Sequence, residues 1–331
     1  MLVAIAALAL GAGIAFARGK ATRIGTGVVV IETNLGYEGG EAAGTGMVLT
    51  STGRVLTNNH VVNGATTIRV VVPGTSRSYA ARVLGYSVTS DVALLQLNGA
   101  SNLRTVSTAG SAKLRIGQSV KAVGNANGTG TLTAASGKIT GLGKTITAGD
   151  EQGHAERLSG LIETNANVQP GDSGGPLLDT SGRVVGMDTA ASTGSGFGIA
   201  FRTPTNDAYA IPIAKALTVA GQIAAGKSSA TVHIGGTAFL GVEVQAVSDG
   251  FGSAEPGALI AAVVPDGPAA NAGLGPGDVI TAVDGRTITT PQSLTTVVLT
   301  RKPGATVQVA YTDQTGASGT VSLTLGSGPP Q

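Results

Sequence analysis

The sequence predicts a mainly β protein with about two domains. The chain has 331 residues, and one domain typically holds about 100–200 residues. Runs rich in Val and Thr recur between Gly and Asn turns, at a spacing of roughly ten residues that is typical of sandwiches and barrels. Glycine contributes 52 residues, and tight connections between short strands need glycine more often than other residues.

The first predicted domain, residues 18–225, consists of short strands followed by one helix. In order, the predicted strand segments are 26–34, 44–62 (two strands around a Ser-Thr-Gly turn), 67–74, 78–87, 91–97, 119–125, 131–143, 160–166, 175–190 and 196–201. Residues 209–227 then change to helical spacing, with Leu217 and Ile223 among good helix formers. We expect this helix to end at Gly226.

Residues 226–236 are small and polar, which predicts a linker. A second domain is expected over 237–326. Its predicted elements are strands at 239–245 and 257–264, a short helix with Pro near its start at 267–274, a hairpin closed by Asp284-Gly285, a capped helix at 290–302 and a final hairpin at 305–325. The tail, residues 327–331, is expected to be disordered.

The composition disfavours several classes of function. Hydrophobic residues make up 42% and charged residues 12% of the chain, which argues against extended disorder. The net charge is +2, the Lys and Arg residues are scattered, and aromatics are 3%, so nucleic-acid binding is not expected. The chain has no cysteine, and His60, His154 and His233 lack a metal-binding spacing. We therefore expect neither a metal nor a cofactor.

Residues 1–17 are apolar and end in Ala-Phe-Ala, an A-x-A cleavage pattern. A basic region before them is missing. As a helix they would reach roughly 25 Å, somewhat short of a ~30 Å hydrocarbon core, and Arg18, Lys20 and Arg23 follow them. We expect export to the cell envelope or beyond, with cleavage near Ala17; the alternative is a retained membrane tether through residues 1–17.

The stretch QPGDSGGPLLD, residues 169–179, places Ser173 in a glycine-rich turn. A serine nucleophile needs a base, a group that orients the base, and backbone donors for the oxyanion. Glycines at 171, 174 and 175 allow the tight backbone that such donors require, and the N–H groups of Gly171 and Ser173 would form the oxyanion hole. The alternative is an ordinary β-turn, because Asp, Ser, Gly and Pro are also common turn residues.

His60, in LTNNHVV at the end of an apolar strand, is the expected base. The alternative is a hydrogen-bonded core or turn histidine. His154 and His233 are interpreted as solvated loop residues.

Asp91 opens TSDVALLQL before a buried strand and is the expected orienting acid, with a strand-capping role as the alternative. Asp150 lies in a charged loop, and the side chain of Asp172, next to the nucleophile, should point elsewhere. The order His60, Asp91, Ser173 is the order found in the chymotrypsin double barrel. An α/β-hydrolase would place serine first, between a strand and a helix.

In these motifs, the chain resembles the HtrA/Deg-type trypsin-like serine proteases with a C-terminal PDZ domain, and within them the exported actinobacterial PepA-like branch. The resemblance runs from about residue 26 to 325. It implies a chymotrypsin-like fold of two six-stranded β-barrels with the site between them, followed by a small α+β PDZ barrel. It also implies that His60 is the base, that Asp91 orients it and that Ser173 attacks.

Two features depart from the family pattern. Many members carry Asn before the serine, whereas this chain has Asp172, as secreted digestive relatives do. Those relatives use the Asp to bind a freed N-terminal amine, but no Ile-Val-Gly-Gly start is present here. Residues 196–213 also form a longer connection than usual.

The expected S1 pocket contains Asn167 at its base together with Val168, Thr189 and Ala191. Because Asn167 is uncharged, a buried Lys or Arg side chain of the substrate would lack a partner. We expect cleavage after small or medium aliphatic residues.

The segment AFLGV, 238–242, resembles a PDZ carboxylate-binding loop made by Phe239, Leu240, Gly241 and Val242. Its backbone donors would hold a terminal carboxylate while the following strand accepts an extended peptide. The alternative is a stable domain without a ligand.

The leading hypothesis is an exported serine endopeptidase that acts on unfolded or secreted polypeptides and binds peptide C-termini through its PDZ domain. The alternatives are a chaperone or peptide-binding scaffold with low or latent proteolysis and, third, an esterase. The sequence leaves open a homo-oligomer.

Overall fold

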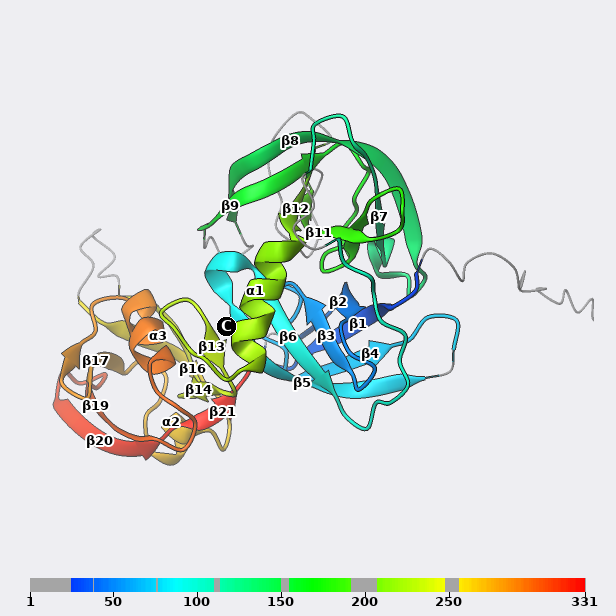
Figure 1. Cartoon of the computed structure of the whole chain (residues 1–331). Coiled ribbons are helices and arrows are strands. Elements are labelled where there is room, and N and C mark those ends of the chain that lie inside the picture. Colours follow the sequence, from blue (N-terminus) through cyan, green and yellow to red (C-terminus); the bar gives the residue numbers. More distant parts are fainter. Residues whose placement is uncertain are drawn as a thin grey trace, which may run out of the picture.

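The computed structural model describes residues 25–37, 39–75, 77–109, 114–149, 155–191, 207–247 and 256–330. The predicted strand 196–201, the segment 1–17 and the loop residues Asp150 and His154 lie outside the described residues. The protein is mainly β, as predicted, and consists of two barrels followed by a smaller α+β domain (Figure 1).

The first barrel is closed by six strands. They are β1 (Val28–Leu35), β2 (Gly40–Val48), β3 (Arg54–Thr57), β4 (Thr67–Val71), β5 (Ser78–Ser87) and β6 (Val92–Leu97). The strands pair in the circular order β1-β2-β3-β6-β5-β4 and back to β1, all antiparallel. Apolar side chains that alternate along these strands, such as Val29, Ile31 and Val55, fill its interior.

The second barrel is also closed by six strands. They are β7 (Ser119–Gly124), β8 (Thr133–Gly149), β9 (Ala155–Thr164), β10 (Pro176–Leu178), β11 (Val184–Ala191) and β12 (Ala208–Pro212). The long β8–β9 hairpin extends beyond the barrel at the top of Figure 1. The two six-stranded barrels confirm the predicted chymotrypsin-like architecture.

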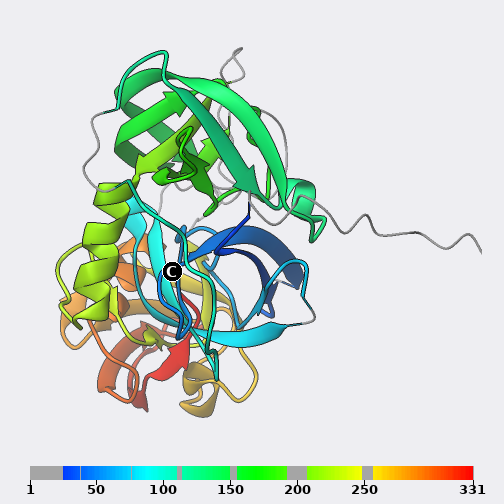
Figure 2. The same ribbon diagram turned by 45° about the vertical axis from the view of Figure 1, so that its right-hand side comes forward.

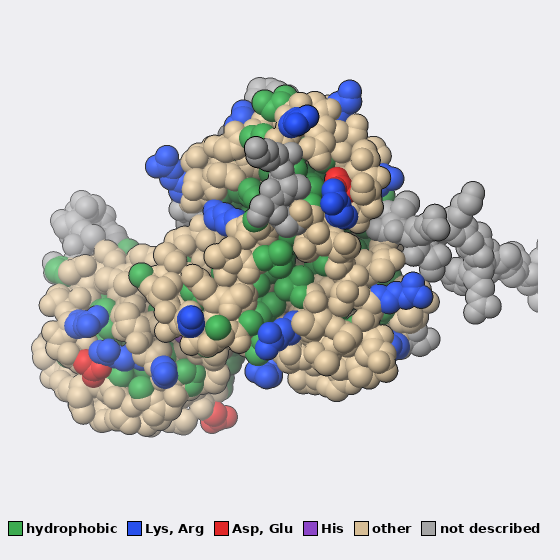
Figure 3. Space-filling view, in the orientation of Figure 1, with side chains coloured by type: hydrophobic (Ala, Val, Ile, Leu, Met, Phe, Trp, Pro, Cys, Tyr) green, Lys and Arg blue, Asp and Glu red, His purple; other side chains and the backbone are tan. Residues whose placement is uncertain are grey.

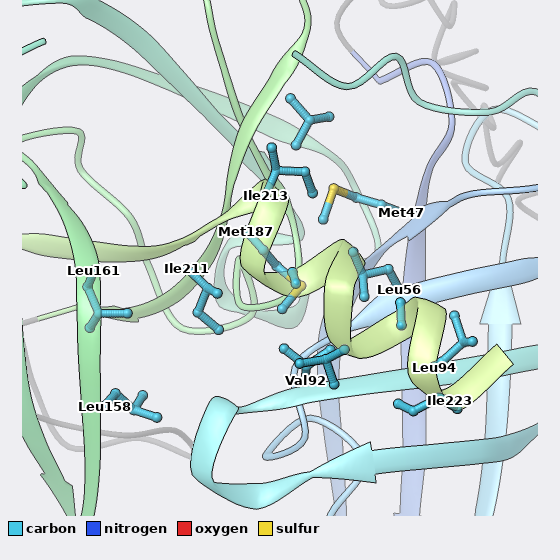
Figure 4. Close-up of a cluster of buried hydrophobic side chains, with 14 of the residues drawn as sticks. Met47, Leu56, Val92, Leu94, Leu158, Leu161, Met187, Ile211, Ile213 and Ile223 are labelled. Atoms are coloured by element: carbon cyan, nitrogen blue, oxygen red, sulfur yellow. The ribbon is translucent and has the colours of Figure 1, made fainter. Parts of the chain in front are cut away.

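Helix α1 (Ile213–Ala224) joins the two barrels; Figure 2 shows it along the side where they meet. Its buried residues enter one cluster with Met47 and Leu56 of the first barrel and Leu161 of the second (Figure 4). The helix begins later than the predicted 209–227 segment. Residues 208–212 form strand β12 instead, because Pro212 ends the strand and fixes the first turn.

The predicted linker, residues 226–236, contains a strand that pairs with the first barrel. Within it, β13 (His233–Ile234) pairs with β5 and adds a seventh strand to the first sheet. Val232 is buried there, and the ring of His233 lies 4.9 Å from that of Tyr86, measured between centroids. His233 is therefore partly buried rather than a solvated loop residue, because long-range pairing orders this short apolar stretch.

The second domain has its own core. Its elements are β14 (Thr237–Phe239), β15 (Val242–Ala246), β16 (Ala258–Val263), α2 (Pro268–Asn271), β17 (Val279–Val283), β18 (Arg286–Thr287), α3 (Pro291–Leu299), β19 (Thr306–Thr312), β20 (Ser318–Thr324) and β21 (Gly326–Gly328). Helix α3 begins with the capping box of Thr290 and Ser293. The Asp284-Gly285 turn has positive φ at both residues, as its hairpin requires.

The described part of the C-terminal tail, residues 327–330, is ordered, which contradicts the disorder expected there; residue 331 lies outside the described residues. Strand β21 pairs with β14, and Pro330 is buried with its carbonyl oxygen accepting a hydrogen bond from the Gly64 N–H at 2.9 Å. The ring of Phe239 covers Gly328 and stacks on Tyr37 of the first barrel at 5.2 Å between centroids. The tail therefore ties the second domain to the turn that follows His60.

Two further observations concern the surface and the helices. On the face shown in Figure 3, Lys and Arg side chains are scattered singly and form no continuous basic patch. Among the helices in the described ranges, none combines the length and the apolar character that crossing a bilayer requires.

Candidate active site

Strand pairing in the first barrel brings His60 and Asp91 together. His60 lies in the turn that follows β3, and Asp91 directly precedes β6. The two strands are neighbours, with Thr57 paired to Ala93, so the chain ends that carry the two side chains meet at the same edge. Asp91 also has a left-handed backbone (φ 49°), which turns the chain sharply into β6.

The Asp91 carboxylate is buried and accepts several hydrogen bonds. His60 Nδ1 lies 3.0 Å from Oδ1 and 2.9 Å from Oδ2, and the backbone N–H of His60 donates to Oδ1 at 3.0 Å. The hydroxyl of Thr189 donates to Oδ2. Because the carboxylate accepts, the Nδ1 of His60 carries the proton, which leaves Nε2 as the basic nitrogen of the neutral ring.

Ser173 lies in the turn before β10, where both barrels meet. Its carbonyl oxygen accepts from the N–H of Thr45, which is on β2 of the first barrel, at 2.9 Å. A Cβ on Gly174 would stand 2.1 Å from the Thr45 carbonyl oxygen, and Gly174 has a φ of +85°. Only glycine fits this position, because the turn packs directly on the backbone of β2.

Thr45 holds the turn from a second direction. Its hydroxyl donates to the Gly171 carbonyl oxygen at 2.7 Å and accepts from the N–H of Asn125 at 2.9 Å. The Pro170 carbonyl oxygen accepts from the N–H of Asn127 at 2.6 Å. The carbonyl groups of Pro170 and Gly171 are therefore both hydrogen-bonded within the protein.

The backbone N–H groups of Gly171 and Ser173 are left as donors by this arrangement. Within the described part of the chain, neither group donates to a protein acceptor, and Gly171 has a φ of +92°. Two unengaged N–H donors in one turn, those of the serine and of the residue two positions before it, are what an oxyanion requires. The Ser173 hydroxyl lies 3.5 Å from the Thr189 carbonyl oxygen, which is a long and weak contact.

The four expected S1 residues occupy different environments. Val168 and Thr189 are buried, but the Thr189 hydroxyl faces Asp91. Asn167 is exposed, and its Oδ1 accepts from the side chain of Gln169 at 2.8 Å, so it does not form the base of a closed pocket. Ala191 lies on β11 opposite Ala208 of β12.

Three polar groups of the site were not predicted in these roles. The hydroxyls of Thr45 and Thr189 and the amide of Asn58, which donates to the Asp91 carbonyl oxygen at 2.9 Å, hold the site together. Asn58 stands two residues before His60, so its proximity to the site could have been noticed. The two threonines belong to no local motif, because their partners come from distant strands.

Two further carboxyl groups are buried beside the turn of Ser173. Asp172 is 3% exposed, and its Oδ2 accepts from the N–H of Gln169 at 2.9 Å. Asp188, on β11, is fully buried. Burial raises the pKa of Asp172 to about 6 and, together with repulsion by Asp172, raises the pKa of Asp188 well above its ordinary value.

The buried Asp172 makes folding stability dependent on pH. A carboxyl whose folded pKa is raised from 3.8 to about 6 favours the folded state fully below the unfolded pKa and loses that contribution as pH rises through the folded pKa. We expect Asp172→Asn to stabilise the inactive Ser173→Ala chain by roughly 2–3 kcal/mol at pH 8 and by almost nothing at pH 4, since one pKa unit corresponds to about 1.4 kcal/mol. Urea unfolding at both pH values measures the difference, and an equal effect at both would contradict it.

The loop at 239–242 in the second domain also has backbone N–H groups that donate to no protein acceptor within the described residues. The carbonyl oxygens of Leu240 and Gly241 accept from Ala269 and Val264, each at 2.9 Å, whereas their N–H groups have no protein acceptor within the described part of the chain. Phe239 precedes them and is partly buried. Val242 begins β15, which is an edge strand of its sheet.

Comparison with known proteins gives two matching family descriptions. Residues 44–187 match the trypsin-like peptidase domain, and residues 238–323 match the PDZ domain.

Two curated relatives are similar over most of the chain. It is 35% identical to the serine protease PepD of Mycobacterium tuberculosis over 92% of the chain and 65% of that protein. It is 34% identical to the periplasmic pH-dependent serine endoprotease DegQ of Escherichia coli, over 81% of the chain and 56% of that protein. The chain thus spans less than two thirds of the length of these relatives.

Solved structures are also similar. The HtrA-type protease AlgW with a tripeptide shows 28% identity and a TM-score of 0.51, covering 94% of the chain and 96% of that structure. The serine endoprotease from Yersinia pestis shows 26% identity and a TM-score of 0.51, over 92% and 96%.

Proposed function

Because the chain belongs to the HtrA-type trypsin-like serine proteases with a PDZ domain, we propose that it is an exported endopeptidase that cleaves unfolded or secreted polypeptides. The observation that carries the proposal is the pair of hydrogen bonds between His60 Nδ1 and the buried Asp91, beside the glycine-rich turn of Ser173. The periplasmic names of similar proteases support the envelope as the location.

In the proposed mechanism, the Ser173 hydroxyl first turns from the Thr189 carbonyl oxygen, a contact of only 3.5 Å and therefore easily broken. Its oxygen attacks the scissile carbonyl carbon while His60 Nε2 takes the hydroxyl proton. Asp91 stabilises the imidazolium that results. The N–H groups of Gly171 and Ser173 stabilise the negative oxygen of the tetrahedral intermediate.

The intermediate then collapses. The C–N bond breaks, His60 gives its proton to the leaving amine, and an acyl ester on Ser173 remains. Water, deprotonated by His60, attacks this ester and releases the new carboxylate and the serine hydroxyl. The reaction needs no redox partner, because no atom changes its oxidation state. Every proton returns to the chain or to the products.

Labelling with a serine-reactive fluorophosphonate and digestion of casein test the proposed protease. The mature chain should be labelled once and should degrade casein. A chain that neither reacts nor digests casein, yet suppresses aggregation of an unfolded protein, would instead support the chaperone or scaffold function.

Cleavage after small or medium aliphatic residues stays a prediction. Digestion of a peptide library tests it, and cleavage mainly after Arg would contradict it.

The PDZ domain is proposed to bind peptide C-termini through the N–H groups of Leu240 and Gly241 and by strand addition to β15. Structures of the HtrA-type protease AlgW with a tripeptide and with a decapeptide show that such a relative binds peptides. In the Ser173→Ala chain, we expect a fluorescent peptide with an apolar, free C-terminus to bind at least about tenfold more tightly than its C-terminal amide, a difference of roughly 1.4 kcal/mol.

Fluorescence anisotropy measures the two dissociation constants, and the amidated peptide is the matched control because only the terminal charge differs. Equal affinity of the two peptides would exclude a carboxylate site. Binding of neither would favour a PDZ domain with a purely structural role.

A further inference from the structure

Two buried carboxyl groups flank the proposed nucleophile on both sides of its turn. Asp172 directly precedes Ser173. Asp188 faces the turn from β11, where its carbonyl oxygen accepts from the Gly174 N–H at 2.8 Å and its N–H donates to the Gly175 carbonyl oxygen at 2.9 Å. Any movement of β11 at Asp188 therefore displaces the residues that follow Ser173.

The carboxyl oxygens of this acid pair, Asp172 and Asp188, have few partners. Among the described residues, only Oδ2 of Asp172 accepts a hydrogen bond, from the N–H of Gln169. Its other oxygen and both oxygens of Asp188 are buried without a partner. The backbone of Gly124 covers the unpartnered oxygen of Asp172, because a Cβ built on Gly124 would stand 2.6 Å from it.

The groups around the acid pair are neutral or acidic. Gly124 covers Asp172 from the end of β7, and the N–H of Gln169 contacts Asp172 from the turn. The ion pairs of the described residues use other acids, so no described Lys, Arg or His neutralises the pair. The next titratable groups, Asp91 and His60, contact Thr189 and each other.

Two unpaired carboxylates cannot both remain charged in such an environment at low cost. Burial without a partner favours the neutral acid, and two neighbouring negative charges repel. Burial raises the pKa of Asp172 to about 6, and burial together with repulsion by Asp172 raises the pKa of Asp188 well above its ordinary value. The two groups titrate as a coupled pair. Because Asp172 keeps one hydrogen-bond donor and neither oxygen of Asp188 has one, the proton that the pair retains is favoured on Asp188.

We propose that Asp188 is a positioning residue for Ser173, which keeps β11 against the nucleophile turn while it is neutral and releases the turn when it ionises at alkaline pH. The step is a simple loss of a proton to solvent, without a co-reactant. A second negative charge next to Asp172 then drives the two groups apart, and the oxyanion donors on the same turn lose their alignment. The inference rests on the proposed role of Ser173 as nucleophile.

The pH profile of acylation by a fluorophosphonate tests this proposal with three variants. The wild-type rate should fall on an alkaline limb by about tenfold per pH unit, as loss of one essential proton requires. Asp188→Asn, which cannot ionise, should remove that limb. Asp172→Asn leaves Asp188 as the single carboxylate of the pair, so its ionisation creates no repulsion and the limb should become shallower. Asp179 is a partly exposed acid on the turn between β10 and β11 that pairs with Arg183, so Asp179→Asn is the control and should leave the limb in place.

A second readout does not need catalysis. In the Ser173→Ala chain, Asp188→Asn should raise the unfolding midpoint much more at pH 9 than at pH 4, because above its ordinary pKa Asp188 ionises in the unfolded chain and this ionisation favours unfolding. If wild type is not labelled at any pH, the proposed nucleophile fails, and this unfolding experiment still decides whether Asp188 holds a proton.

Three results would overturn the inference. The alkaline limb could persist unchanged in Asp188→Asn, or it could keep its full depth in Asp172→Asn. Alternatively, Asp188→Asn could lower both labelling and stability at every pH, which would show that a cation, such as a freed N-terminal amine, neutralises the pair.

Discussion

Replacing Ser173 by alanine is expected to abolish both fluorophosphonate labelling and casein digestion. The change removes the only atom that forms the acyl ester in the proposed mechanism, and loss of the serine in a related triad lowers kcat by about 10⁶. The backbone of the turn should be unaffected, since its hydrogen bonds to Thr45 and Asp188 use the main chain. The variant should therefore unfold at the same temperature as wild type.

Ser181→Ala is the matched control for this experiment. Ser181 is exposed on the turn between β10 and β11, and only its backbone N–H is used, in a bond to Asp179 at 2.9 Å. Its replacement should leave casein digestion within about twofold of wild type, as surface changes usually do. Casein digestion that survives in Ser173→Ala would show that another residue is the nucleophile.

Replacing Asp91 by asparagine should lower kcat by about 10⁴, the loss seen when the triad acid becomes an amide. The carboxylate accepts from His60 Nδ1 and from the Thr189 hydroxyl. An amide group facing Nδ1 donates instead, which moves the imidazole proton to Nε2. A ring with its proton on Nε2 cannot take the proton of Ser173.

Steady-state cleavage of a fluorogenic peptide measures this effect, with Asp179→Asn as the control for changing an acid to its amide. Because the side chain keeps its shape, KM should change little while kcat falls. Activity of Asp91→Asn within about tenfold of wild type would assign Asp91 a structural role, such as capping β6.

The fold class could be predicted because runs rich in Val and Thr recur between Gly and Asn turns. Strand β1 is such a run, and its residues 28–31 are all buried, whereas β4 buries alternate residues. Segments without such a pattern could not be placed. The linker residues 232–234 pair with β5 or pack in the core, and the tail residues 326–330 pair with β14 or bond to Gly64. Local composition does not encode such distant partners.

In the candidate site, too, residues marked by a local motif could be predicted, and residues that act through distant contacts could not. The motifs around His60 and Asp91 were enough to predict a pair that the structure brings into contact. That Ser173 completes the triad, and the catalytic roles of all three residues, stay predictions. Thr45 and Thr189 act through contacts between barrels, and a single threonine in a strand carries no signal. Asp172 departs from the family pattern, whereas Asp188 lies in the predicted strand segment 175–190, where nothing in the pattern signals a second buried acid.

The ordered tail has a practical consequence for anyone who extends this polypeptide. Pro330 lies against Gly64, four residues after His60, so an affinity tag or a fluorescent protein joined to Gln331 would leave from the protease domain and not from the far side of the PDZ domain. Such a fusion would crowd the histidine turn. In a longer protein, whatever follows this point has its anchor within reach of the same turn.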